Sequence, residues 1–149
     1  MLNELVTDIM ADFTDEDGEA LVPSEYVERA AERVLPLVSA DLDVDYELSE
    51  GEVSPVMPGD HRELWLLRSK IQVCRHLRAQ AASRVSFSSG DKKMDRSREA
   101  ANWAALEKDM GSEYASRVKR INPATDDTVL KTDVVPLVYS RGSQTPGME

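Results

Sequence analysis

The fold of this chain is decided mainly by residues 60–85, which read DHRELWLLRSKIQVCRHLRAQAASRV. Apolar and small side chains recur here every three or four residues, the spacing that places them on one face of an α-helix. That face comprises Leu64, Leu67, Ile71, Cys74, Leu77 or Arg78, Ala81, Ala82 and Val85. Asp60 and Glu63 have the spacing of a capping box, with aspartate in place of serine or threonine. The pattern predicts a helix that begins at Asp60 and continues for about six turns.

A second long helix is predicted from Asp95 to about Asn122, where Pro123 stops it. Its apolar stripe consists of Trp103, Leu106, Met110, Tyr114, Val118 and Ile121. Residues 85–94 between the two helices form a polar connector with a Ser-Ser-Gly-Asp turn signal. We therefore expect two long helices that run antiparallel.

Two shorter helices are predicted upstream. Residues 2–13 carry apolar side chains at helical spacing, and the acidic residues 15–19 then form a turn that contains Gly18. A second helix is expected from its N-cap, Ser24. Because Pro36 lies inside its apolar pattern, a kink or a break is predicted just before that residue.

The pattern changes period after this helix. In residues 41–48, apolar side chains alternate with Asp and Glu, which predicts a short extended acidic segment with one buried face. Residues 49–59 contain two prolines and two glycines and are predicted to form a loop.

Beyond Pro123 the helical period disappears and the chain becomes β-prone. The apolar residues of this part are Val129, Leu130, Val134, Val135, Leu137, Val138 and Tyr139. Pro136 permits an edge strand or an extended arm but no central strand. This arm either packs on its own domain or docks on another chain by strand addition. We expect a helical domain at 1–122 and an extended arm at 123–149.

Together these elements predict a mainly α protein, a small bundle of about four helices with a short extended acidic segment and an extended C-terminal arm. Its 149 residues suit one domain. The lone cysteine, Cys74, excludes an internal disulfide and fits a reducing compartment. No apolar run is long enough for a membrane helix, and no secretory signal is visible at the N-terminus.

The charge of the chain is unevenly distributed. Residues 1–60 hold 17 acids and two bases, residues 61–121 hold 7 acids and 14 bases, and residues 122–149 hold 4 acids and 2 bases. The acidic and basic halves could neutralise one another within the fold, or across a contact between subunits. Alternatively, the basic helix 62–84 could face nucleic acid.

Within that basic helix, Arg62, Arg68 and Arg75 are six and seven residues apart, so they share a rough stripe. They are candidates for contacts between subunits. Phosphate contact would require these cations to converge on one exposed surface.

Catalytic and metal chemistry find little support in the sequence. Cys74 and His76 point apart on a helix and lack the further ligands that zinc needs, so a buried thiol is expected at Cys74. The acidic turn 15–19 does not fit a calcium loop, because Phe13 and Ser24 would occupy positions that require carboxylates. No catalytic motif is recognisable, and we expect no enzyme, no metal and no cofactor.

The order of elements resembles that of head-to-tail adaptor (connector) proteins of tailed bacteriophages. The segment Val85-Ser86-Phe87-Ser88-Ser89-Gly90-Asp91, followed by Lys92-Lys93-Met94-Asp95-Arg96-Ser97, is similar to that family's loop before its last long helix. Trp103 and Tyr114 match the aromatic face of that helix and the tyrosine near its end. The resemblance covers roughly residues 1–121.

The resemblance implies a structural virion protein of the head-tail neck, made in the host cytoplasm. Family members form rings, usually of twelve copies, between the portal protein and a stopper or tail-completion protein. Genomic DNA passes through the channel without specific binding, and extended C-terminal segments grip the portal. Two other hypotheses stay open: a DNA-binding packaging or regulatory subunit that uses helix 62–84, and a small helical enzyme.

Overall fold

The computed structural model describes residues 1–85 and 91–124, with the backbone alone at 84, 85 and 91–97. Its elements in chain order are α1 (Leu2–Asp12), α2 (Ser24–Leu42), β1 (Glu47–Ser49), β2 (Glu52–Ser54), α3 (Gly59–Val85) and α4 (Asp91–Ile121). The described part of the chain is therefore mainly α, as predicted. None of its helices combines the length and the apolar character needed to cross a membrane.

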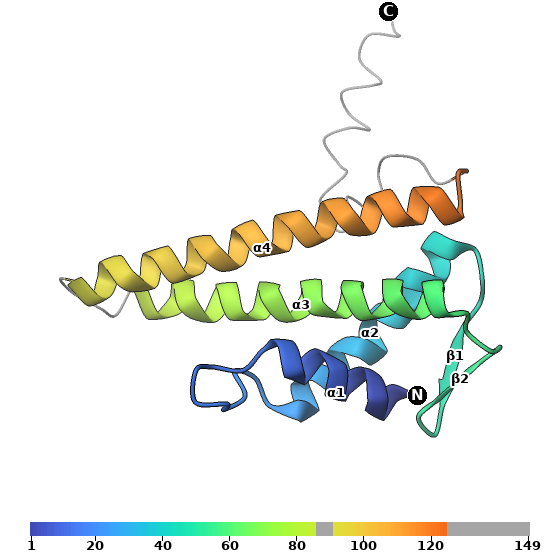
Figure 1. The fold of residues 1–149 in the computed structure, drawn as a ribbon, viewed down its shortest axis with the longest axis horizontal. Coiled ribbons are helices and arrows are strands. Elements are labelled where there is room, and N and C mark those ends of the chain that lie inside the picture. Colours follow the sequence, from blue (N-terminus) through green and yellow to red (C-terminus); the bar gives the residue numbers. More distant parts are fainter. Residues whose placement is uncertain (86–90, 125–149) are drawn as a thin grey trace, which may run out of the picture.

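Helix α3 is the centre of the fold. Figure 1 shows α3 and α4 side by side and antiparallel, with α1 on the opposite side of α3 and with α2 crossing α3 so that its end reaches α4. The two-stranded sheet lies at the end of the bundle where α3 begins. This arrangement confirms the predicted pair of long antiparallel helices.

Because neighbours cover α3 on two sides, it is buried on more than one stripe. The predicted residues Leu64, Ile71 and Cys74 are buried. Trp65 and Val73, which the predicted face did not include, are equally enclosed. The indole Nε1–H of Trp65 donates to the carbonyl oxygen of Ala31 on α2, at 2.9 Å. Residues fully enclosed in the core include Leu5, Ile9, Val27, Ala31, Val38, Leu64, Trp65, Val73, Cys74, Tyr114 and Val118.

On α4 the predicted stripe is only partly buried. Tyr114 and Val118 are enclosed, but Leu106 is 41% exposed. Helix α4 packs mainly on α3, which buries a narrow strip of its surface. The ring of Trp103 reaches across to Phe13 at the end of α1, with 6.0 Å between the ring centroids.

The predicted break at Pro36 is wrong, because α2 runs as one helix to Leu42. Pro36 lies on the solvent side. The helical hydrogen bond that it cannot form belongs to a turn that faces solvent, so no buried carbonyl oxygen is left without a partner by the proline. The side chains of Val27, Ala31 and Val38 hold the two halves of α2 on the same core.

Residues 41–59 also differ from expectation. The alternation of burial is present, since Tyr46 is buried between exposed Asp45 and Glu47. However, the strand is confined to β1, and the predicted loop contains its partner β2. Glu50 and Gly51 connect the strands with φ angles of 52° and 82°. Two positive φ values are typical of a type I′ hairpin turn.

Candidate functional site

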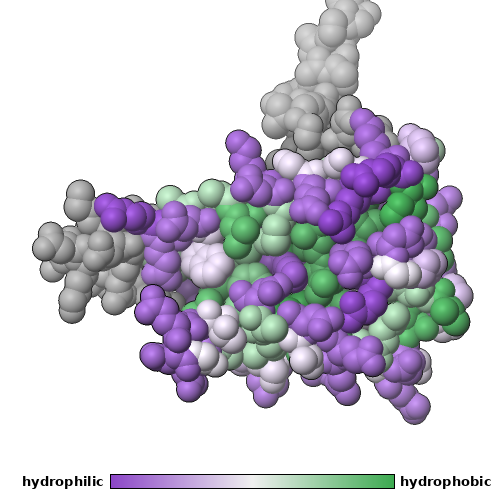
Figure 2. Space-filling view, in the orientation of Figure 1, coloured by the Kyte–Doolittle hydropathy of each residue, from purple (hydrophilic) through white to green (hydrophobic). Residues whose placement is uncertain are grey.

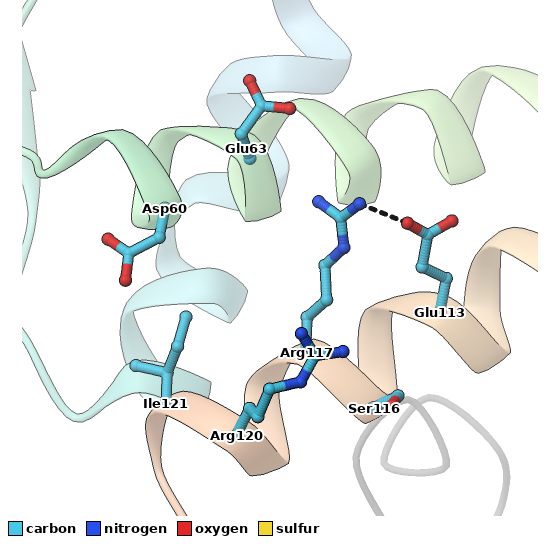
Figure 3. A pocket seen from close by; sticks show the side chains of 7 residues that line it. All are labelled: Asp60, Glu63, Glu113, Ser116, Arg117, Arg120 and Ile121. Atoms are coloured by element: carbon cyan, nitrogen blue, oxygen red, sulfur yellow. Dashed lines mark ion pairs between the residues drawn. The ribbon is translucent and has the colours of Figure 1, made fainter.

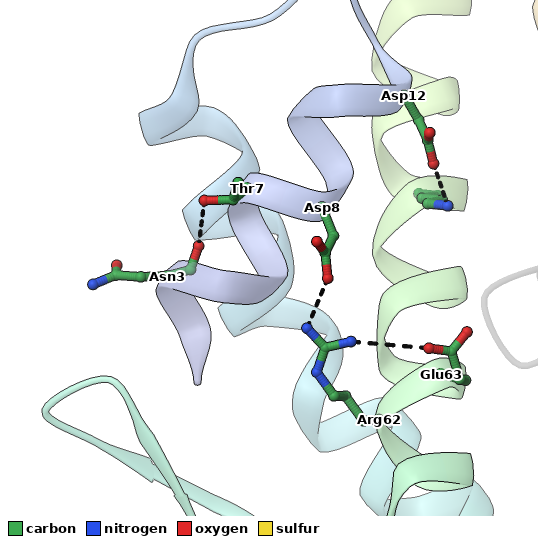
Figure 4. A network of polar contacts seen from close by, with 7 residues as sticks. Asn3, Thr7, Asp8, Asp12, Arg62 and Glu63 are labelled. Carbon is green, nitrogen blue, oxygen red and sulfur yellow. Dashed lines mark hydrogen bonds and ion pairs between the residues drawn. The ribbon is translucent and has the colours of Figure 1, made fainter.

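Two cations of α3 pair with the acidic helix α1. Arg62 donates to Asp8 at 2.8 Å and lies 3.9 Å from Glu63, the next residue on α3 (Figure 4). About two turns further along α3, Lys70 forms an ion pair with Asp12. Part of the basic helix is therefore neutralised by the acidic N-terminal half of the same chain.

Arg68 lies inside the bundle rather than on its surface. Its side chain is 3% exposed, and its guanidinium carbon lies 5.4 Å from the centroid of the Tyr114 ring. The Tyr114 hydroxyl donates to Asp41 Oδ2 at 2.6 Å. The Asn122 amide Nδ2 donates to the Asp41 carbonyl oxygen at 3.1 Å. Burial, together with the hydrogen bond to Asp41, raises the pKa of Tyr114 well above its usual range. This cluster joins α2, α3 and α4.

Arg75 and Arg78 both contact one carboxylate of α4. Arg75 Nε lies 2.7 Å from Glu107 Oε2, and Arg78 lies 2.8 Å from Glu107 Oε1. Cys74 is fully buried beside them, which confirms the predicted buried thiol. Burial and the Glu107 carboxylate raise the pKa of Cys74 to about 12, against an opposing effect of Lys70.

Each of the two histidines packs against a tyrosine from an earlier part of the chain. Nδ1 of His61 lies 2.6 Å from the Tyr46 hydroxyl, and the two rings meet edge to face. His76 stacks on Tyr26 with 4.0 Å between the centroids, and its Nε2 lies 3.0 Å from Gln80 Nε2. Among the described residues, no three His, Cys, Asp or Glu side chains converge in a way that could hold a metal ion.

An open groove of about 540 Å³ lies where α3 begins and α4 ends. Asp60 and Glu63 of α3 line this groove with Glu113, Arg117 and Arg120 of α4, and Figure 3 shows the side chains of Glu113 and Arg117 extending from α4 toward α3. Arg117 pairs with Glu113, one turn before it on the same helix. The groove carries both signs of charge, so it is suited to polar contacts with another macromolecule.

The acidic half keeps most of its charge at the surface. In the part of the chain that the structure describes, no ion pair involves these exposed acids of residues 15–50: Asp15, Glu16, Asp17, Glu19, Glu25, Glu28, Glu32, Asp43, Asp45, Glu47 and Glu50. Neutralisation within the fold is thus partial. The remaining acidic surface covers α2 and the segments that flank it.

The predicted interface arginines do not form one exposed stripe. Arg62 and Arg75 are partly buried in ion pairs, and Arg68 is enclosed. The arginines differ from the prediction because their partners are Asp8, Tyr114 and Glu107, which lie far away in the sequence. A role of these arginines in subunit contacts stays a prediction.

The predicted docking arm, from Val129 to Tyr139, lies outside the described residues. Of the segment 85–97 on which the adaptor resemblance rests, residues 86–90 also lie outside the described residues. Residues 91–94, which were predicted as part of the connector, belong to α4, which begins at Asp91 and not at Asp95. Comparisons of this chain with protein-family models, with curated proteins and with solved structures gave no match.

Proposed function

We propose that this protein is a structural, non-enzymatic head-to-tail adaptor of a tailed bacteriophage. In this role it forms a ring, of about twelve copies, between the portal and a stopper or tail-completion protein in the virion neck. Genomic DNA passes through the ring without specific binding.

The observation that carries the proposal is the arrangement of the helices. A long antiparallel pair, α3 and α4, packs against the shorter α1 and α2, of which α2 crosses α3 (Figure 1). This is the order of elements on which the resemblance to adaptor proteins rests. Within the described residues, α4 packs on α3 and, near its end, on the end of α2.

The surface charge supports the passage of DNA without adhesion. Figure 2 shows hydrophilic side chains over most of one face, with hydrophobic ones gathered mainly in the region of α3. The net charge is −10, and those cations of α3 whose side chains the structure describes are engaged by carboxylates of the same chain or lie inside the bundle. A channel that carries DNA must not hold phosphates strongly, and an acidic protein meets that requirement.

The decisive experiment is the mass of the native particle, alone and after mixing with the portal protein, by native mass spectrometry or mass photometry. Twelve copies of the 16.6-kDa chain weigh about 200 kDa. A ring of this order, free or formed on the portal, is the expected result. A protein that remains monomeric or dimeric in both conditions would refute the proposal.

The arm is tested separately on the portal. Deletion of residues 128–149 is expected to weaken portal binding. The matched full-length variant replaces Val134, Val135, Leu137 and Val138 by serine, which keeps the length and removes the apolar contacts. If both variants bind the portal as tightly as the wild type, the arm does not dock on the portal. The proposal that the protein forms a ring is not affected by that result.

The alternative is a DNA-binding packaging or regulatory subunit that uses helix 62–84. The pairing of Arg62 with Asp8 and of Arg75 with Glu107 does not favour it, because these cations are already neutralised. It remains a prediction, to be tested by the DNA titration described in the Discussion.

A further inference from the structure

Arg29 and Arg33 are the two bases among the first 60 residues, and both are exposed. They lie one turn apart on α2 and line an open groove of about 210 Å³ together with Gln72 of α3. Within the described residues, neither guanidinium takes part in an ion pair or a side-chain hydrogen bond. Two like charges one turn apart destabilise a helix slightly, so a partner that brings negative charge to this groove would relieve their repulsion.

The walls of this groove suit a carboxylate. A guanidinium presents paired N–H donors that match the two oxygens of a carboxylate, and the amide of Gln72 adds a further donor. Tyr26 forms another wall, and its ring is held by the stack on His76. The site is thus built from two helices that the core already fixes, which limits the entropy lost on binding.

The surroundings favour a carboxylate of a protein over the phosphates of DNA. Glu25, Glu28 and Glu32 lie on the same helix and are all exposed. A polyanion laid along α2 would meet these three carboxylates as well as the two arginines. A short acidic segment that enters the groove end-on avoids them.

The chain itself carries such a segment in the turn after α1. The Asp15 carboxylate accepts hydrogen bonds from the backbone N–H groups of Asp17 and Glu19, at 2.9 and 2.8 Å. Thr14 and Ala20 close the turn by backbone pairing. The turn is therefore preorganised, and the exposed side chains at positions 16, 17 and 19 make no ion pair in the described structure.

We propose that the groove formed by Arg29 and Arg33 binds the acidic turn, residues 15–19, of a second copy of this chain. In a ring, the groove of each copy receives the turn of one neighbour while its own turn enters the groove of the other neighbour, so the contact is heterologous and can be repeated until the ring closes. The inference rests on the proposed function, for which it supplies one contact between neighbouring subunits.

The test uses two charge-reversal variants of the full chain. The groove variant carries Arg29→Glu and Arg33→Glu, and the turn variant carries Glu16→Arg and Asp17→Arg. In the groove variant the facing charges have the same sign, and in the turn variant the net negative charge of the turn is removed and two arginines face the arginines of the groove. The concentration needed for assembly should therefore rise by at least about tenfold in each variant alone. In an equimolar mixture, every groove can meet a turn of opposite charge. The mixture should therefore regain the wild-type mass, on the portal if the wild type needs it.

Two further variants serve as controls. Arg98→Glu with Lys108→Glu makes the same change in net charge at exposed positions of α4, and it should assemble like the wild type. Arg29→Gln with Arg33→Gln removes the charge without adding acids to α2, in case the groove variant fails to fold. Circular dichroism melts establish the folding of each variant, and the neutral variant should also assemble more weakly than the wild type.

The outcomes separate this inference from the proposed function. If the wild type forms a ring and the neutral groove variant assembles equally well, the ring stands and the groove contact is wrong. A mixture of the reversal variants that stays disassembled also excludes the pairing. Loss of duplex-DNA binding in the neutral variant, with assembly intact, would assign the groove to phosphate instead. A wild type that never assembles refutes both proposals.

Discussion

At the scale of single residues, the polar contacts inside the bundle connect parts of the chain that are distant in sequence. Tyr114 on α4 donates to Asp41 at the end of α2, 73 positions earlier, and packs under the guanidinium of Arg68. Buried polar groups require such partners, because an unsatisfied donor or acceptor costs about 1–3 kcal/mol. The cluster thereby fixes the end of α4 on the other helices.

Replacement of Tyr114 by phenylalanine should lower the free energy of unfolding by about 1–3 kcal/mol, since Asp41 loses a short hydrogen bond while the ring remains. Urea denaturation measures this change. The matched control is Tyr26→Phe, because the Tyr26 hydroxyl makes no hydrogen bond within the described residues. Equal stability of the two variants would show that the bond to Asp41 contributes nothing.

Cys74 provides a test by pH. Its pKa is raised from 9.0 to about 12, chiefly by burial and then by Glu107. The unfolded chain releases this proton near pH 9, whereas the folded protein retains it to about pH 12. The thiol therefore contributes stability that is complete below pH 9 and is lost as the pH rises through this window.

The comparison is between the wild type and Cys74→Ala, unfolded in urea at several pH values above and below 9. The variant should be less stable at neutral pH, because it leaves a small cavity. It should also lose less stability than the wild type as the pH rises above 9. Parallel pH profiles for the two proteins would contradict the raised pKa.

At the scale of elements, α1 is attached to the bundle by apolar burial more than by charge. Leu5 and Ile9 are fully buried, whereas Asp8, which pairs with Arg62, is half exposed. Exposed ion pairs contribute about 0–1 kcal/mol, and a buried isoleucine contributes several times more.

Ile9→Ala should therefore lower the free energy of unfolding by about 2–5 kcal/mol. A double-mutant cycle with Asp8→Ala and Arg62→Ala should give a coupling energy below about 1 kcal/mol. Chemical denaturation of these variants yields both values. If the coupling energy of Asp8 and Arg62 exceeded the free energy of unfolding lost in Ile9→Ala, the ion pair would contribute more than the apolar burial.

Helix α2 tolerates Pro36 because the missing backbone hydrogen bond lies on its exposed side. Pro36→Ala should raise the free energy of unfolding by about 1–3 kcal/mol, since alanine restores the N–H donor and favours the helix. Pro36→Gly restores the same donor and should remain about 1 kcal/mol less stable than the alanine variant. Thermal melts rank the three proteins, and a destabilised alanine variant would show that the proline fits this helix better than alanine does.

At the scale of the whole molecule, the net charge of −10 and the ion pairs of Arg62 and Arg75 on α3 predict weak contact with DNA. Fluorescence anisotropy with a duplex of about 30 base pairs should show no saturable binding at about 0.15 M salt. Tight binding with a steep salt dependence would support the DNA-binding alternative instead. The titration is made with the ring as well as the free chain, because assembly changes the surface that DNA meets.

The sequence by itself determined the local features of this protein. The helical periods of residues 2–13 and 60–85, the acidic turn and the buried thiol of Cys74 all agree with the structure. Periodicity, capping and turn chemistry act over a few residues, so they can be read without knowing the neighbours. At Pro36 the same signals predicted a break, but the helix continues. They also did not predict the hairpin turn at Glu50 and Gly51.

Only the tertiary structure decided which surfaces are buried and which charges remain. Trp65 and Arg68 lie on a second face of α3 that becomes enclosed when α2 and α4 pack against it. Arg62 and Arg75 are neutralised by carboxylates 54 and 32 positions away, whereas Arg33 remains without an ion pair in the described structure. Charge pairing and burial depend on distances between elements, and those distances are set by packing rather than by local sequence.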